Sequence, residues 1–365
     1  MKPRLGLTII DWYIIRKFLG TFFFSLALIL SIAVIFDLSE KIDNFIEKSA
    51  PIKAVIFEYY VNFIPYFALI FSSLFTFISV IYFTSRMAYR SEIIAILSNG
   101  MSFHRLLIPY FLSAMIIAIF AFVLSDYVLP RANTVRLAFE ELYVHTRPFS
   151  FKEKNIHRQI APGVFIYMES YSTMSDLGHK FSMEKYVDGE LVSKLMSDYI
   201  KWDSTTNKWT IRNYYIRNIN GLTETVETGR SIDTTLNLLP GDFKRRINIV
   251  ETMNIRELNE FIDNALSQGE SNIDAYKIEK HKRYSYPFST FILTLIGVSV
   301  SSRKVKGGIG VQIGIGLTVA FSYILFMQFS SQFAISGKLE PVMAVWLPNI
   351  MFVIISIFLY RLAPK

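Results

Sequence analysis

Residue types that can act in catalysis occur in this chain, but none of them stands at the spacing that a catalytic motif requires. The sequence has no H-E-x-x-H zinc motif, no G-x-S-x-G nucleophile turn and no P-loop lysine for ATP phosphates. It has no Cys, and its five histidines are scattered, at His104, His145, His157, His179 and His281. We therefore predict no catalytic residue, no metal site and no bound cofactor on this chain, and we expect any ATP hydrolysis to take place on a separate subunit.

Charged residues are missing from six long stretches, and these stretches determine the class of protein. Each has 19 to 31 residues, and a helix needs about 20 apolar residues to cross a bilayer core. Lipid offers the backbone no hydrogen bonds, so such stretches must be helices, and the short alternating strands of a β-barrel do not fit them. The sequence thus predicts a polytopic α-helical membrane protein. The six predicted transmembrane helices are Phe18–Phe36, Tyr59–Ser85, Leu106–Ser125, Tyr284–Ser302, Gly307–Gly337 and Pro341–Tyr360.

Lysine and arginine are distributed unevenly over the short segments that flank these helices. If the N-terminus is cytoplasmic, the cytoplasmic flanks hold twelve basic residues and the outer loops hold four. Because basic flanks stay on the cytoplasmic side, both termini are predicted to be cytoplasmic. The net charge of +8 comes either from this bias or from attraction to an anionic substrate or lipid headgroups. The cytoplasmic set is Lys2, Arg4, Arg16, Lys17, Arg86, Arg90, Arg105, Arg303, Lys304, Lys306, Arg361 and Lys365, and the outer set is Lys41, Lys48, Lys53 and Lys338.

A polar insert separates the first three helices from the last three, and it lies on the outer side in this topology. It is rich in β-forming residues, with hairpin signals at Asp188-Gly189 and Asn220-Gly221 and a polar turn between two tryptophans at Trp202–Trp209. Short strands at this spacing predict a β jelly-roll or sandwich. The predicted domains are 1–130 with helices 1–3, 131–253 with the β jelly-roll, 254–283 as a helical connector and 284–365 with helices 4–6.

The segment between the second and third helices is amphipathic and too short to cross the membrane. It lies near residues 86–100, where Glu92 precedes an apolar set that includes Ile93 and Leu97, and Gly100 ends the pattern. This pattern predicts a short cytoplasmic helix. The helix either rests on the bilayer surface or serves as a docking helix for a cytoplasmic partner.

Two further segments carry local signals. Residues 37–53 follow the first charge-free stretch on the outer side, and their spacing predicts a small amphipathic helix lying at the membrane interface. In the fifth helix, Gly310-x-x-x-Gly314 is a small-residue pattern that lets two helices approach closely. These glycines serve either packing within this chain or contact with a partner.

Several strings of the sequence, taken in order, resemble one family of membrane proteins. They are the opening string Asp11–Leu19, the string Glu92–Pro109, the Trp202–Trp209 hairpin, Tyr286–Phe288 with the glycine-rich fifth helix, and Pro341–Pro348. In this order, with a β insert after the third helix, the chain resembles the LptF/LptG permease family (the YjgP/YjgQ family) over nearly its whole length. Its length and ending favour the LptG kind.

The resemblance implies a permease subunit of an ABC transporter in the bacterial inner membrane, and therefore a transport protein rather than an enzyme. Such a permease extracts lipopolysaccharide from the inner membrane and passes it to a periplasmic bridge toward the outer membrane. The implied partners are a cytoplasmic LptB-like ATPase dimer, which carries the ATP, a second LptF/LptG-type permease, a single-span LptC-like jelly-roll protein and an LptA-like bridge, with no nucleic acid. The alternative is a mechanotransmission permease, which drives a periplasmic domain without moving substrate through its own helices.

The resemblance also implies which residues couple this chain to the ATPase. Glu92 matches the carboxylate of the family's coupling helix. Together with Arg90, Ile93, Leu97 and Gly100 it forms the implied ATPase-coupling surface.

A second implied site is the cavity that receives lipopolysaccharide. Lys41 matches a basic position near the outer end of the first helix, and Arg131 and Arg136 fall where the family carries basic residues above the third helix. Cations at the mouth of a cavity favour the entry of the anionic lipid A phosphates. Gly310 and Gly314 then belong to helix packing or to a gate.

Overall fold

In the computed structural model, the described part of the chain forms two compact units. The helical unit contains Met1–Phe139, Glu251–Ile255 and Lys277–Lys365, and the β unit contains Glu140–Val250 and Arg256–Tyr276. The structure describes residues 7–144, 152–243, 247–270, 272–303 and 308–363. His145 and the flanking residues Lys2, Arg4, Lys304, Lys306 and Lys365 lie outside these ranges.

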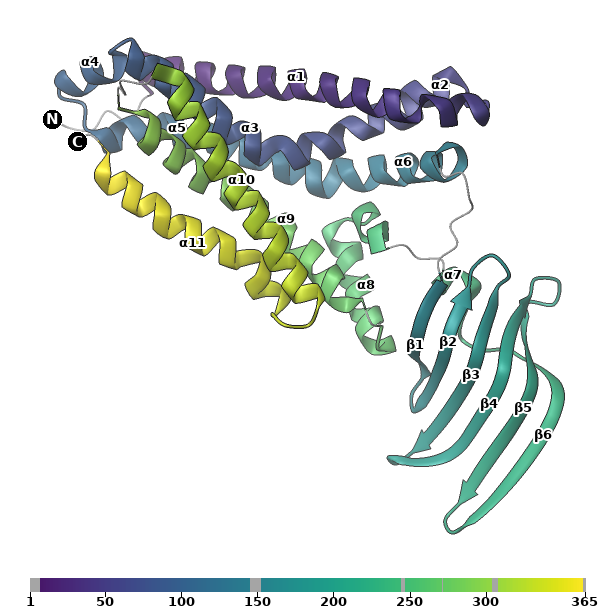
Figure 1. Cartoon of the computed structure of the whole chain (residues 1–365). Coiled ribbons are helices and arrows are strands. Elements are labelled where there is room, and N and C mark those ends of the chain that lie inside the picture. Colours follow the sequence, from purple (N-terminus) through teal and green to yellow (C-terminus); the bar gives the residue numbers. More distant parts are fainter. Residues whose placement is uncertain (1–6, 145–151, 244–246, 271, 304–307, 364–365) are drawn as a thin grey trace. The chain divides into compact units, whose positions relative to one another are not determined.

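The helical unit is organised around α3, along which both α1 and α10 pack (Figure 1). α5 packs against α1, and α11 packs against α10. The short helix α4 lies between α3 and α5, and the start of α1 and the end of α11 lie at the same end of the unit (Figure 1). The elements are α1 (Ile9–Glu47), α2 (Ile52–Ala54), η1 (Val55–Tyr60), α3 (Val61–Tyr89), α4 (Glu92–Ser98), α5 (Phe103–Val123), η2 (Leu124–Val128), α6 (Leu129–Tyr143), η3 (Ile247–Thr252), α9 (Ile273–Ser301), α10 (Gly308–Ile335) and α11 (Pro341–Leu362).

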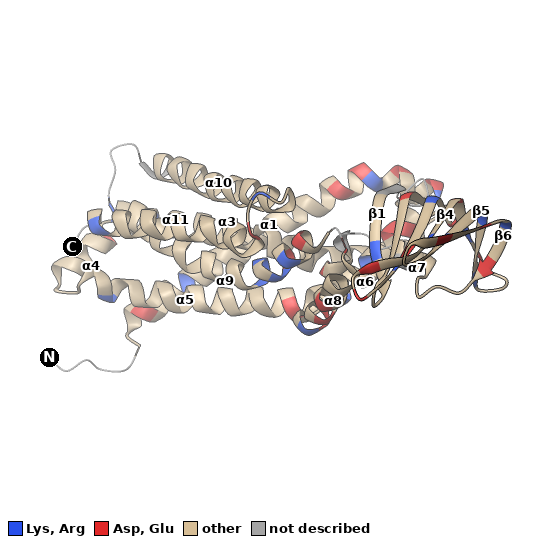
Figure 2. Ribbon diagram, turned by 90° about the horizontal axis from the view of Figure 1, so that it is seen from below, with Lys and Arg blue, Asp and Glu red and all other residues tan. Residues whose placement is uncertain are grey.

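Five of the described helices are long and apolar enough to cross a membrane, which confirms a polytopic membrane protein. The fourth predicted stretch, Tyr284–Ser302, is helical within α9 but is not one of these five, because serine, threonine and tyrosine recur along it. Figure 2 shows long tan sections along α5, α10 and α11, with charged residues gathered toward helix ends. The five helices are Ile9–Glu47, Ile52–Tyr89, Phe103–Tyr143, Gly310–Ile335 and Pro341–Leu362.

The first helix is longer than the sequence pattern indicated. α1 has 39 residues and therefore measures about 58 Å at 1.5 Å per residue, nearly twice the bilayer core. The expected separate interfacial helix at 37–53 is wrong, since α1 continues through the acidic segment to Glu47 before the chain turns at Pro51. In its polar last turns Lys41 pairs with Asp37, and the ring of Phe45 packs edge-on against Tyr59 and Phe139.

The β unit contains six strands that form one antiparallel sheet in chain order, β1-β2-β3-β4-β5-β6. Figure 1 shows this sheet curved. The turn signals are confirmed: Asp188 and Gly189 both have positive φ between β3 and β4, and Trp202 pairs with Trp209 across the next hairpin. The strands are β1 (Lys152–Ala161), β2 (Val164–Ser172), β3 (Leu177–Val187), β4 (Glu190–Asp203), β5 (Lys208–Asn220) and β6 (Thr223–Thr234).

The predicted β domain is confirmed, but its described strand order is that of a meander. A jelly roll in the strict sense is built of two Greek keys. Here every described connection between strands is a short hairpin, and a short hairpin can only place consecutive strands side by side. The first residues of the predicted 131–253 domain are helical, because α6 continues from α5 to Tyr143.

The concave core of the β unit is centred on a fully buried tryptophan. Trp209 donates its indole N–H to the carbonyl of Leu238 at 2.8 Å and packs against Tyr171 and Phe243. The short helix α7 (Pro240–Phe243) contributes Phe243 to this core. A second helix, α8 (Ile255–Gln268), buries one apolar face through Leu258, Ile262 and Ala265.

Candidate functional site

The segment predicted from sequence as a short coupling helix is helical and forms α4. It lies at one end of the helical unit, which is called here the α4 end. Ser91 precedes it in a left-handed conformation, φ 60°, and Gly100 follows it at φ 87°. Glu92 in its first turn accepts a hydrogen bond from the hydroxyl of Tyr13 on α1, at 3.1 Å. Sequence analysis missed this contact, because the two residues are far apart in the chain.

The side chains of the predicted coupling surface do not all face outward. Ile93 is fully buried and Leu97 is half-buried, both packed into the core of the α4 end. Arg90 and Gly100 are exposed. The apolar side chain that α4 presents outward is instead Ile94, which is 54% exposed.

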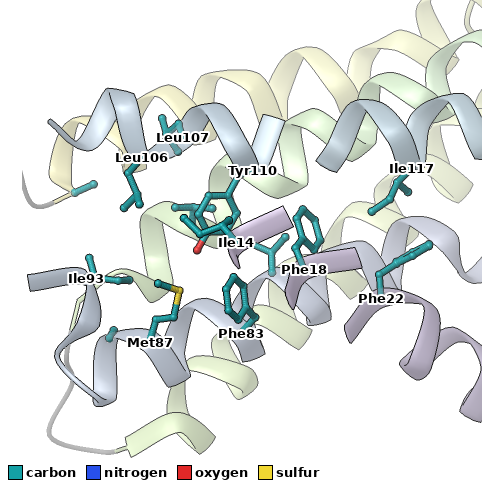
Figure 3. Packing of buried hydrophobic residues seen from close by; sticks show 14 of the residues in the cluster. Ile14, Phe18, Phe22, Phe83, Met87, Ile93, Leu106, Leu107, Tyr110 and Ile117 are labelled. Carbon is teal, nitrogen blue, oxygen red and sulfur yellow. The ribbon is translucent and has the colours of Figure 1, made fainter. Parts of the chain in front are cut away.

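Beneath α4 lies the largest apolar cluster of the helical unit (Figure 3). In Figure 3, Ile93 points toward Met87, and the ring of Tyr110 lies close to Ile14 and Phe18 of α1. The hydroxyl of Tyr110 lies 2.9 Å from that of Thr84, so this buried polar group is paired. The cluster thus fixes the position of α4 against α1, α3 and α5.

A half-buried ion pair, in which the carboxylate is enclosed and the guanidinium is partly exposed, lies next to this cluster. Arg105, at the start of α5, donates two hydrogen bonds to the carboxylate of Asp11 at 2.7 and 2.5 Å. Asp11 is 1% exposed and also accepts from the backbone amide of Thr8, while Thr8 caps the first turn of α1 in return. The arginine fork and the cap together satisfy a carboxylate that burial alone would disfavour.

The three predicted substrate cations differ in their surroundings. Lys41 forms an ion pair with Asp37 at 2.7 Å, one turn earlier on α1, and hydrogen-bonds to the hydroxyl of Tyr59. Arg136 is buried, stacks over the ring of Tyr66 and donates to Asn133. Arg131 is exposed on α6. The structure therefore does not gather the three cations into one cluster.

A short strap, residues 251–255, is anchored to two helices of the helical unit, the helix Phe103–Tyr143 and α9. The amide N–H of Ile255 donates to the carboxylate of Asp126 at 2.6 Å, and Arg283 donates to the carbonyl of Met253 at 2.7 Å. Asn133 contacts both the carbonyl and the carboxylate of Glu251, at 3.4 and 3.5 Å. No signal in the sequence indicated this strap.

The strap borders a cavity of about 470 Å³ lined mainly by apolar side chains of α3 and α10. Glu251, Glu279 and Lys282 stand at its polar side. Burial, and then the nearby carboxylate of Glu279, raise the pKa of Glu251 to about 7, against the opposite effect of three surrounding cations. Glu251 is therefore a carboxyl group that titrates near neutral pH.

The two predicted packing glycines do not serve packing within the described chain. A Cβ on Gly310 or Gly314 would meet no atom within 4 Å, and both are exposed. Close approach occurs instead at Gly316, where a Cβ would lie 2.1 Å from Ile81 of α3, and at Gly297, where it would lie 2.8 Å from Val80.

These features define a polytopic membrane protein that carries a β domain. The sites described above are polar and apolar contacts between its helices. Among the described residues, no group of His, Cys, Asp and Glu is placed to hold a metal ion. The model of the family "Lipopolysaccharide export system permease LptF/LptG" matches residues 12–362, nearly the whole length, and the chain belongs to this family. None of the curated proteins matches the chain.

Proposed function

We propose that this lipopolysaccharide export permease extracts its substrate from the inner membrane and passes it to a periplasmic bridge, driven by an LptB-like ATPase dimer on the cytoplasmic side. The observation that carries the proposal is α4. It is a short helix between two membrane-length helices, with one face buried in the core and an exposed isoleucine, Ile94, on the other. Such a helix can receive a partner without unfolding, since its own packing is already complete.

In this proposal the α4 end is cytoplasmic. The start of α1 and the end of α11 lie there with α4 (Figure 1), and the basic bias of the sequence points the same way. The second permease pairs with this chain in the membrane, and the exposed Gly310 and Gly314 of α10 are proposed to face that neighbour or the LptC-like helix.

For the substrate, Arg131 is proposed as the cation that is available to a lipid phosphate, because it is exposed. Lys41 and Arg136 are also proposed to contact the lipid phosphates, but each would first have to give up its present partner within the chain. Lys41 would have to leave Asp37, and Arg136 would have to leave the face of Tyr66. A charge near a phosphate at the headgroup surface is worth about 1 kcal/mol, so single substitutions should be mild.

One observation favours the mechanotransmission alternative. The helix from Phe103 to Tyr143 is uninterrupted, 41 residues long, and it begins directly after α4. A continuous helix could carry a movement of α4 across the membrane without any substrate passing along the chain.

Photocrosslinking distinguishes the two functions. A crosslinker at Arg131 should capture lipopolysaccharide in cells, whereas one at the exposed Phe358 of α11 should not. Glu92→Lys should uncouple ATP hydrolysis from this capture, and Glu190→Lys, the same change in an exposed β turn, should not. Absence of labelling at Arg131 in an assembled, ATP-hydrolysing complex would favour mechanotransmission.

A further inference from the structure

The first turns of α1 contact both ends of the segment that contains α4. At the near end, the hydroxyl of Tyr13 donates to the carboxylate of Glu92 in the first turn of α4. At the far end, Asp11 holds the guanidinium of Arg105 through two parallel hydrogen bonds. Two residues of one helix turn thus hold both ends of residues 92–105.

The two contacts differ in strength and exposure. The Asp11–Arg105 pair is bidentate, and the carboxylate is 1% exposed, so its rupture would leave a charge in the interior. The Tyr13–Glu92 bond is more exposed and joins a neutral donor to a carboxylate. The Asp11–Arg105 pair fixes α1 to α5, and the Tyr13–Glu92 bond orients α4 relative to α1.

Between these two points the packing leaves no space for α4 to slide. Ile93 and Ile14 are both fully buried in the same cluster (Figure 3). Phe103 belongs to this cluster as well and is 4% exposed. Packed cores respond to force by moving as a body rather than by deforming. Farther along, α1 is little packed within this chain, since only 17% of its membrane window is buried.

We propose that Asp11, Tyr13 and Arg105 form a two-point clamp, which makes α4 and the base of α1 one rigid body. Any force that a cytoplasmic partner applies to α4 then tilts α1 as a lever of 39 residues. The inference rests on the proposed coupling role of α4, and it assigns to Asp11, Tyr13 and Arg105 the role of positioning residues. They act through α4 rather than by contact with substrate or ATP.

The test is a distance measurement between spin labels in the purified complex with its ATPase. Because the chain has no Cys, labels at Lys17→Cys on α1 and Ser98→Cys on α4 are unique, and both positions are exposed. In the otherwise unchanged chain, the distribution should be narrow and should stay the same in the ATP-bound and vanadate-trapped states. ATPase activity and lipopolysaccharide release are recorded on the same samples.

Variants break the clamp at one point each. Arg105→Ala leaves the buried carboxylate of Asp11 unpaired, and Asp11→Asn removes the charge that holds Arg105. Both variants should broaden the distribution and lower the lipopolysaccharide released per ATP by about ten-fold. Arg105→Lys keeps a cation opposite Asp11 and leaves the capping box intact, so it should change both readings less than Arg105→Ala. Tyr13→Phe removes a single oxygen, keeps the core, and should lower release per ATP more mildly, so the test does not depend on variants that fail to fold.

The outcomes separate the clamp from the proposed function. A label distance that changes with nucleotide in the unchanged chain, or clamp variants with unchanged distance and unchanged release per ATP, would overturn the clamp. An invariant distance in a complex that hydrolyses ATP but never releases lipopolysaccharide would sustain the rigid body and refute the extraction function instead.

Discussion

Glu251 offers the sharpest prediction about stability, because its carboxyl is held in a partly apolar site beside the cavity. Its pKa is raised from 4.5 to about 7. The folded protein therefore retains a proton that the unfolded chain releases, and stability is highest below the ordinary pKa and is lost as pH rises through about 7. The charged and polar groups that face it are Asn133 and Arg136 of α6 and Glu279, Lys282 and Arg283 of α9.

The magnitude follows from the displacement of the pKa. A rise from 4.5 to about 7 corresponds to about 3 kcal/mol if the full effect reaches the folding equilibrium. The carboxyl is only partly enclosed, so water screens it and about 1–2 kcal/mol is the expected loss between pH 5 and pH 8. Glu251→Gln removes the titration while keeping the shape and the contact with Asn133.

The assay is thermal unfolding of the purified protein in detergent across this pH range. The melting temperature of the parent chain should fall more steeply than that of Glu251→Gln between about pH 4.5 and pH 7. Above about pH 7 the carboxyl is ionised in both the folded and the unfolded chain, so the two curves should run parallel there. Glu190→Gln, at an exposed turn, is the matched control and should follow the parent. Parallel curves for the parent and Glu251→Gln below about pH 7 as well would refute the reasoning.

Four further substitutions test packing, with thermal or denaturant unfolding as the measurement. Gly316→Val should cost about 1–3 kcal/mol by overpacking against Ile81, whereas Gly310→Ala should leave the melting temperature of the isolated chain unchanged. Trp209→Ala should cost about 3–5 kcal/mol in the β unit, because it removes a fully buried ring and a hydrogen bond. Asn349→Leu should cost about 1–3 kcal/mol, since this buried amide pairs with a tyrosine hydroxyl and a backbone carbonyl. Unfolding of Gly310→Ala at a much lower temperature, or a β unit indifferent to Trp209→Ala, would contradict these assignments.

The parts of the fold that were predictable are those with local signals. Charge-free stretches of membrane length predict helices because, in the bilayer, every backbone N–H and C=O of the stretch must be hydrogen-bonded within the protein. Asp188-Gly189 predicts its hairpin because the turn itself requires positive φ at both positions. The end of α1 was missed because the charges at 37–47 resemble an interface, while Lys41 and Asp37 in fact neutralise each other one helical turn apart.

The candidate site was less predictable, since it is made of contacts between distant residues. Asp11 and Arg105 lie 94 residues apart, and no pattern near either one indicates the other. The helical spacing correctly placed an apolar face on α4, but spacing alone cannot tell whether that face meets a partner or the core, and Ile93 meets the core. The strap at 251–255 has no sequence signal, because its anchors are mostly backbone groups.

The proposed function is that this permease moves lipopolysaccharide out of the membrane with the energy of an ATPase docked on α4. Its most direct test is ATP-dependent release of lipopolysaccharide from proteoliposomes that contain the purified complex, with a soluble periplasmic acceptor outside. The account predicts release that requires ATP and the acceptor and that falls in Glu92→Lys while ATP hydrolysis persists. Steady ATP hydrolysis without any transfer of lipopolysaccharide to the acceptor would contradict it.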